Sequence, residues 1–219
     1  MAELNRSVIL LACQIDVPAM TTAAERHAHT DRVAAAFDAE LTAGGPVDLV
    51  VLPELGTLEC APSCFDGVDE MDEPLDDSPT IDRLREVAVV AHRTPVLAGM
   101  ARKGDPKDQV GSAFITHYIT QALIGADGSV AGHYDKLHIA QFGDSTKKDY
   151  FTRGDRLLVF EAGGFTFGTI ICYDIRIPEL SRILARRHGV DAILHPTAFC
   201  RDETSHTWHA FATTRAIEN

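Results

Sequence analysis

The 219-residue sequence lacks the features of a membrane protein and of a nucleic-acid-binding protein. No apolar run approaches the roughly 20 residues that span a bilayer. The apolar segment 7–12 is short and no cleavage pattern follows it, so we expect no signal peptide and no membrane partner. Basic residues are few, since 20 Lys and Arg stand against 32 Asp and Glu, giving a formal net charge of −12. Contacts to phosphates need clustered lysine and arginine, so we expect no nucleic-acid partner.

Cysteine is scarce, odd in number and irregularly spaced, which is untypical of a disulfide framework and favours a reduced, cytoplasmic protein. One group, Cys200, His206 and His209, has the ligand types of a zinc site. Its spacing matches no standard zinc motif and no fourth ligand is evident, so we expect no metal. The glycine-rich segment 163–168 opens no suitable helix, as a phosphate-binding loop would, and we expect no cofactor. The five cysteines are Cys13, Cys60, Cys64, Cys172 and Cys200.

The sequence does contain an alternation of strand-like and helix-like segments. Short apolar runs predict strands, and apolar positions such as Val33, Phe37 and Leu41 predict one face of a helix. Alternation of this kind predicts a single α/β domain over residues 1–219, with helices covering a sheet. The expected strands are 7–13 (buried), 48–52, 95–100, 112–124, 129–134, 157–160, 165–171 and 191–194. The expected helices are 21–43, 79–91, 178–188 and 204–217.

Residues 66–77 are strongly acidic, with seven carboxylates. Their spacing fits no EF-hand calcium loop. We therefore expect a solvated surface loop.

Three reactive side chains directly follow expected strands, namely Glu54, Lys136 and Cys172. Reactive groups in α/β sheets gather at the carboxyl ends of strands, so the three could meet there. A carboxylate can take the proton of a thiol, and an ammonium group favours the thiolate and stabilises an oxyanion. The backbone N–H of Tyr173, in the turn after the cysteine, is a second candidate donor to that oxyanion.

This combination suits acyl transfer from a carbon–nitrogen bond through a thioester. Each residue taken alone also has an ordinary structural interpretation. Cys172 could be an inert buried thiol, Glu54 could cap a turn, and Lys136 could lie on the surface.

The segments around these residues resemble the nitrilase superfamily of carbon–nitrogen hydrolases. Five pieces match in the family's order and cover nearly the whole chain. They are LVVLPE (49–54), YDKLH (134–138), YFTRGD (150–155), ICYDIRIPEL (171–180) and TRAIEN (214–219).

The resemblance implies an α-β-β-α sandwich in which Glu54 is the general base, Lys136 the oxyanion stabiliser and Cys172 the nucleophile. The Cys-Tyr-Asp run resembles the amidase-type branches, because true nitrilases usually carry Cys-Trp-Glu here. It implies hydrolysis of a small-molecule amide. An N-carbamoyl-amide hydrolase, an acyltransferase and a non-catalytic binding or assembly module are the alternatives. Members commonly form homodimers or larger homo-oligomers, and the helix 178–188 resembles the one that pairs across their interface.

The sequence departs from the family at two places. Many members carry another glutamate shortly before the Tyr-Phe-x-x-Gly-Asp segment, where this chain has Lys147; Asp144 or Asp149 could replace that carboxylate. Two ammonium groups should repel, so we expect Lys147 either to turn to solvent or to make one of the two lysines lose its proton more easily. Relatives also usually continue past the last matching segment with further strands of the second sheet. His195, which follows a strand, is a second candidate for positioning the substrate, or simply a turn residue.

Overall fold

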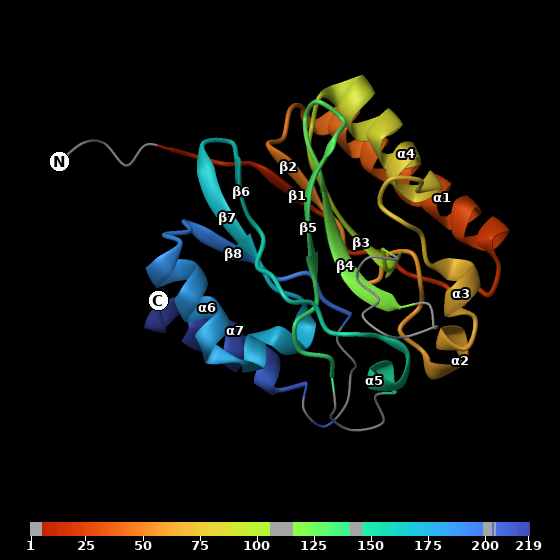
Figure 1. Ribbon diagram of the computed structural model, residues 1–219. Coiled ribbons are helices and arrows are strands. Elements are labelled where there is room, and N and C mark those ends of the chain that lie inside the picture. The colour runs from red at the N-terminus through yellow and green to blue at the C-terminus, as the bar shows by residue number, and fades with distance from the viewer. Residues whose placement is uncertain (1–5, 106–115, 141–145, 199–202, 204) are drawn as a thin grey trace.

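The computed structural model describes residues 6–105, 116–140, 146–198, 203 and 205–219. Its strands form two sheets packed face to face (Figure 1). In the first sheet β1–β2–β3 are parallel, and β4 and β5 continue it antiparallel. In the second sheet β6 and β7 are antiparallel, and β8 joins parallel to β7. The strands are β1 (Leu10–Ala12), β2 (Leu49–Val51), β3 (Val96–Lys103), β4 (His117–Ile124), β5 (Val130–Asp135), β6 (Val159–Ala162), β7 (Phe165–Thr169) and β8 (Ala192–Leu194).

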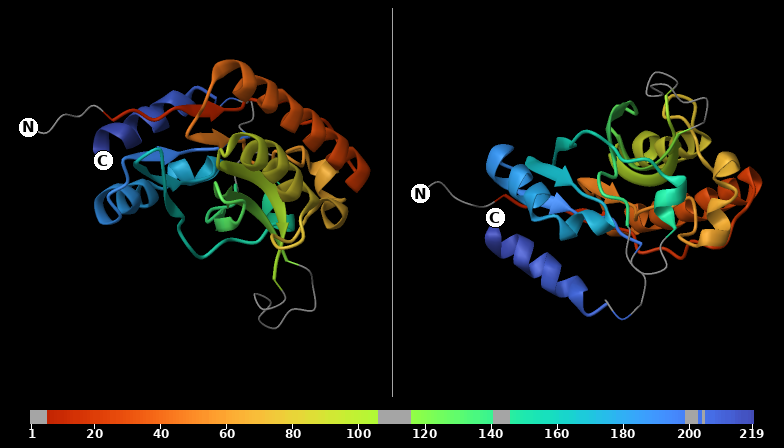
Figure 2. Two further views of the ribbon diagram at one scale, coloured as in Figure 1. Left: turned by 90° about the horizontal axis from the view of Figure 1, so that it is seen from above. Right: turned by 60° about the horizontal axis from the view of Figure 1, so that its bottom comes forward.

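Helices cover the outer faces of both sheets, which makes the predicted α-β-β-α sandwich (Figures 1 and 2). On the first sheet lie α1 (Ala23–Gly44) and α4 (Pro79–Leu84), the latter continued by a π-helical segment, Arg85–Ala91. On the second lie α6 (Pro178–Arg182), continued by Ile183–Arg187, and α7 (Thr207–Glu218). The short helices are α2 (Pro62–Phe65), α3 (Val68–Met71) and α5 (Lys147–Tyr150), with a 3-10 turn at Cys172–Arg176.

Local signals in the sequence explain where the two long outer helices begin. Thr22 accepts the N–H of Glu25, whose carboxylate in turn accepts the N–H of Thr22, so α1 starts with a capping box. Ser78 accepts the N–H of Ile81 ahead of Pro79, which confirms the predicted start of α4. Both helices then bury one apolar face against the first sheet.

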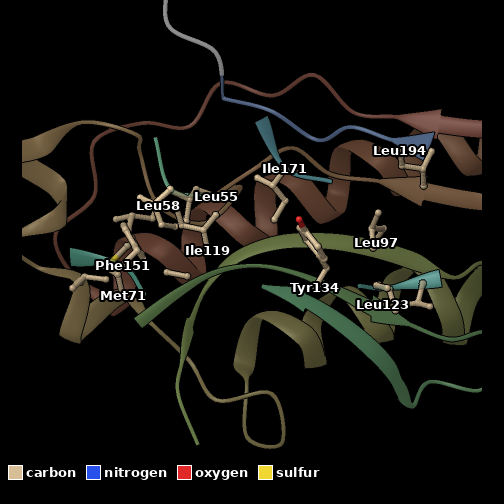
Figure 3. Packing of buried hydrophobic residues seen from close by; sticks show 14 of the residues in the cluster. Leu55, Leu58, Met71, Leu97, Ile119, Leu123, Tyr134, Phe151, Ile171 and Leu194 are labelled. Carbon is tan, nitrogen blue, oxygen red and sulfur yellow. The ribbon is translucent and has the colours of Figure 1, made fainter. Parts of the chain in front are cut away.

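The core between the sheets consists of apolar side chains from both of them (Figure 3). Leu97 and Tyr134 from the first sheet face Ile171 and Leu194 from the second side of the sandwich. Burying aliphatic side chains of this size stabilises a fold by roughly 1.5–3 kcal/mol each. The ends of β2, β5 and β7 are thereby held close together, and these are the strand ends that carry the reactive residues.

Two expectations from the sequence are wrong in detail. The apolar run 7–13 is not a buried strand: among the described strands β1 pairs only with β2 and lies at the edge of the first sheet, and Ile9 is 56% and Leu10 36% exposed. An apolar run predicts a strand but does not say whether that strand is central.

The acidic segment 66–77 is also not wholly a solvated loop. Asp72 is buried against His117, with 2.8 Å between Oδ2 and Nδ1, and Glu73 is buried against Arg26 at 2.6 Å. Both partners lie far away in the sequence, so the acidic composition alone did not indicate these pairs. In the described parts of the chain, no helix is both long and apolar enough to cross a membrane.

Candidate active site

Glu54 comes directly after β2, where the backbone passes close to the neighbouring strand. A Cβ atom added to Gly99 of β3 would lie 1.7 Å from the carbonyl oxygen of Pro53. Gln121 Nε2 donates to the same carbonyl at 3.3 Å. Gly99 and Gln121 therefore set the position of Pro53 and, through it, of the buried Glu54 carboxyl group.

Gly99→Ala is expected to displace the Pro53 carbonyl, because the clash is with backbone that cannot rotate away. We expect a loss of about 1–3 kcal/mol in the free energy of unfolding. We also expect a fall of about a hundredfold in activity, since Glu54 moves with Pro53. Chemical denaturation and a rate assay measure the two effects. The control is Gly44→Ala, where an added Cβ has nothing within 4 Å; equal effects of the two variants would contradict this account of Gly99.

Lys136 follows β5 and is held through its own backbone. Its N–H donates to the carbonyl of Ile119 at 2.8 Å, and its carbonyl accepts the N–H of Gly154 at 3.0 Å. A Cβ on Gly154 would lie 2.2 Å from the carbonyl oxygen of Asp135, so only glycine fits there. The Asp135 carboxylate is itself buried in a bidentate pair with Arg102, at 3.0 and 2.7 Å. The YFTRGD segment, which contains Gly154, therefore helps to hold the backbone of Lys136 in place.

Cys172 begins the 3-10 turn after β7 with a left-handed backbone, φ 45°. A non-glycine residue in this region is strained, and such strain is found preferentially at functional sites. The N–H of Cys172 donates to the carbonyl of Pro196 at 3.1 Å. Tyr173 is the next residue, and N–H groups in the first turn of a helical segment lack partners within it. The role of the Tyr173 N–H as a donor to an oxyanion stays a prediction.

The buried carboxylate of Asp174 holds this turn together. It accepts the N–H of Ile171 at 3.0 Å, the hydroxyl of Tyr134 at 2.7 Å and the N–H of His138 at 2.8 Å. Asp174 thus ties the cysteine turn to the end of β5, close to Lys136. Asp174 belongs to the ICYDIRIPEL segment, but the sequence does not predict its role, because two of its partners, Tyr134 and His138, come from a distant segment.

The structure brings the three predicted reactive residues together around the Glu54 carboxylate. Lys136 Nζ lies 2.6 Å from Glu54 Oε1, with Lys136 0% and Glu54 1% exposed. The N–H of Ala198 donates to Oε2 at 3.0 Å. Cys172 lies near enough to Glu54 for the carboxylate to act on its thiol, and its Sγ donates to the carbonyl oxygen of Ala198 at 4.0 Å.

Lys147 joins this cluster rather than turning to solvent. Its Nζ lies 3.0 Å from the same oxygen, Glu54 Oε1, and the residue is 7% exposed. Burial disfavours its charge, but the Glu54 carboxylate outweighs that effect and raises the pKa of Lys147. The expected repulsion between the two lysines is therefore offset by the carboxylate that both contact. The expectation of repulsion took only the two lysines into account and left out the Glu54 carboxylate.

The same charges act on the acid and the thiol. Burial alone would raise the pKa of Glu54, but Lys136 and Lys147 hold it well below its ordinary range. Burial, and then Glu54, raise the pKa of Cys172 to about 12, against the lowering influence of both lysines. The expected lowering of the thiol pKa is thus wrong for the resting site: the raised pKa of Cys172 favours the protonated sulfur, and the lowered pKa of Glu54 favours the ionised carboxylate. The thiol proton must leave as the sulfur attacks, and Glu54 is the adjacent acceptor.

A second thiol lies beside Lys147 and was not predicted as part of the site. The Lys147 ammonium group acts on the Cys60 thiol, and burial, the larger influence, raises the pKa of Cys60 to about 11. No local pattern marks Cys60, since it enters the site from the segment between β2 and α2.

The sequence predicts two residues that position the substrate, Asp144 and His195. Asp144 lies outside the described residues. His195 lies behind Cys172, where its Nε2 is 2.9 Å from the carbonyl oxygen of Cys172 and its ring stacks on Trp208. Burial lowers the pKa of His195, which favours a neutral ring. Its contacts favour support of the cysteine backbone, and a role toward substrate stays a prediction.

A cavity of about 240 Å³ is lined in part by Glu54. Apolar side chains such as Leu55 and Leu58 line most of it, together with Thr197 and Ala198 opposite them. Cavities that are largely apolar with a few converging polar groups are typical of small-molecule sites.

The predicted absence of zinc stays a prediction, since Cys200 lies outside the described residues. Within the described ranges, no group of three or more histidine, cysteine or acidic side chains could hold a metal ion.

Comparison with known proteins agrees with this geometry. The profile of the carbon-nitrogen hydrolase family matches residues 12–219. This chain belongs to that family. Among solved structures, Nit3 of Saccharomyces cerevisiae, described as a member of branch 10 of the nitrilase superfamily, superimposes with a TM-score of 0.78 at 22% identity. The match covers 100% of this chain and 75% of Nit3, and it shows the fold.

Similar curated proteins are amidases by name. Omega-amidase NIT3 of Saccharomyces cerevisiae is 25% identical over 201 residues, which are 89% of this chain and 66% of that protein. N-carbamoylputrescine amidase of Solanum tuberosum is 37% identical over 83 residues, 37% of this chain and 27% of that protein. The chain thus spans less than two thirds of the length of these curated relatives.

Proposed function

We propose that this protein hydrolyses a non-peptide carbon–nitrogen bond, in the amide of a small molecule, through a thioester on Cys172. The observation that carries the proposal is the convergence of Glu54, Lys136 and Cys172 from three separate strand ends into one buried cluster beside a cavity. Membership of the carbon-nitrogen hydrolase family and the amidase names of relatives support it.

In the first half-reaction, the sulfur of Cys172 attacks the amide carbon while its proton passes to Glu54. The carbonyl oxygen gains negative charge next to the Lys136 ammonium group and the N–H of Tyr173, and both stabilise it. The carbon–nitrogen bond then breaks, and Glu54 returns the proton to the departing ammonia or amine. The acyl group remains on sulfur as a thioester.

In the second half-reaction, water replaces the departed amine. Glu54, again ionised, takes a proton from water while the water oxygen attacks the thioester carbon. The carbon–sulfur bond breaks, the proton passes to the sulfur, and the carboxylic acid leaves. No cofactor or metal is needed for these steps.

Release of ammonia from a panel of small primary amides, at neutral pH, tests this proposal. The panel includes an N-carbamoyl amine, because the relative named for N-carbamoylputrescine keeps that substrate class as the second candidate. Adding an acceptor amine separates hydrolysis from acyl transfer, since transfer leaves the acyl group on the added amine. A binding or assembly module, the remaining alternative, would release nothing from any member of the panel.

Lys147→Met is expected to move the acidic limb of the pH profile to higher pH. The lysine helps to hold the pKa of Glu54 low, and catalysis requires the ionised carboxylate. Removing the ammonium group therefore raises that pKa, and activity is lost at a pH where the parent still works. The expected displacement is at least about one pH unit, the usual influence of a nearby opposite charge.

The profile of kcat/KM against pH measures this displacement, because it reports groups of the free enzyme. Lys148→Met is the matched control, since Lys148 is the exposed neighbour in α5. An acidic limb that stays in place in Lys147→Met would show that Lys147 does not contact Glu54 in the working enzyme.

The protein is further proposed to form a homodimer or a larger homo-oligomer through α6 and its continuation, Ile183–Arg187. Ile183 is 37% exposed there, which leaves apolar surface for a second copy. Light scattering of the parent and of Ile183→Asp tests this, with a smaller assembly expected for the variant.

A further inference from the structure

We propose that Glu59 selects substrates whose acyl part carries a positively charged or strongly hydrogen-bond-donating group at its far end. The proposal rests on the proposed amidase function and names its substrate class. Glu59 lines the same cavity as Glu54, and it comes from the segment that connects β2 to α2.

The carboxylate of Glu59 has unused capacity to accept hydrogen bonds. Cys64 Sγ donates to Oε2 at 3.3 Å. Burial and Glu59 raise the pKa of Cys64, so this thiol stays protonated and remains a donor. Among the described residues, Oε1 has no hydrogen-bond partner and no lysine, arginine or histidine pairs with the carboxylate.

The rest of the cavity does not neutralise this charge. Its described lining contains no cationic side chain, and Ile15, Val17 and Leu58 form apolar walls. The two nearby lysines, Lys136 and Lys147, are already paired with Glu54. A ligand that crosses apolar walls and ends on a carboxylate with no cationic partner among the described residues is complementary when its end is a cation.

The size of the cavity limits the ligand. A volume of about 240 Å³ restricts the ligand to a small molecule. An unbranched ω-amino amide such as 5-aminopentanamide is such a molecule. In this cavity its amide would lie toward Glu54 and its ammonium group toward Glu59.

Three amides with the same number of non-hydrogen atoms separate charge from size. 5-Aminopentanamide is cationic, hexanamide is neutral, and succinamate is anionic. Binding is measured by calorimetry on the Cys172→Ala variant, which leaves the amides intact. The same measurement is made after adding Glu59→Gln, which keeps the shape and removes the charge, or Glu161→Gln, an exposed carboxylate on β6 outside the cavity.

We expect 5-aminopentanamide to bind at least about tenfold more tightly than hexanamide, and succinamate to bind most weakly, as for a charge-assisted contact. Glu59→Gln should remove the preference for the cation and change hexanamide affinity by less than about twofold, while Glu161→Gln should change neither. Equal affinities, a preference for succinamate, no binding of any of the three, or a preference that survives Glu59→Gln would each overturn the proposal. Binding with the expected order but no ammonia release from the parent would instead contradict the amidase function alone.

Discussion

Replacing Cys172 with alanine is expected to lower amide turnover at least about a thousandfold and to leave the fold intact. The substitution removes the sulfur that forms the covalent intermediate, and alanine has no nucleophilic atom in its place. It removes little packing volume, and alanine keeps the backbone hydrogen bond to the carbonyl of Pro196. Ammonia release measures turnover, and circular dichroism with thermal unfolding measures the fold.

The matched control is Cys13→Ala, which removes another half-buried thiol. Burial and Glu40 raise the pKa of Cys13 to about 11, so it resembles Cys172 in its ionisation but not in its position. Cys13→Ala should retain nearly all activity. If the Cys172→Ala variant kept more than about a thousandth of the parent's activity, covalent catalysis through this residue would be wrong.

Glu54→Gln is expected to affect both activity and stability. The amide side chain cannot accept the thiol proton, so turnover should fall at least about a thousandfold. It also leaves the buried Lys136 and Lys147 ammonium groups without their counter-charge. Breaking a buried ion pair by removing one partner typically costs about 3–5 kcal/mol, and we expect a loss of that size in the free energy of unfolding.

A double variant separates these two effects. In Glu54→Gln/Lys147→Met, one of the two unpaired ammonium groups is gone, so part of the lost stability should return while activity stays absent. Denaturant unfolding at pH 7 of the parent, both single variants and the double variant gives the coupling between the two residues. Additive losses would contradict the direct contact between Lys147 and Glu54.

The sequence was informative where a feature depends on neighbouring residues. Alternating apolar runs predicted the layered α/β fold, and the Thr22 and Ser78 caps act within their own helices. The position of Glu54, Lys136 and Cys172 after strands predicted their meeting, since strand ends in packed sheets converge. The family resemblance added the pairing of the two sheets.

Features that depend on distant partners could not be predicted in this way. Lys147 stays buried because its ammonium group forms an ion pair with Glu54, which lies 93 positions away in the sequence. Glu73 is buried because Arg26 of α1 forms an ion pair with it. Cys60 and Glu59 carry no motif, and their place beside the cavity follows from the path of the chain after β2. The sequence predicts the residue types of such a site. It does not predict that one carboxylate contacts both lysines and balances their charges.

The central claim is that an acyl group passes through the sulfur of Cys172, and mass spectrometry of the acyl-enzyme tests it most directly. The parent is mixed with an amide that it hydrolyses, quenched in acid at short times, and measured intact and after peptide mapping; hydroxylamine in a parallel sample traps the thioester as a hydroxamate. The account predicts one added acyl group, replacing one hydrogen, on the peptide that contains Cys172, and no adduct in Cys172→Ala. An acyl group on Cys60 instead, or turnover with neither an adduct nor a hydroxamate, would contradict it.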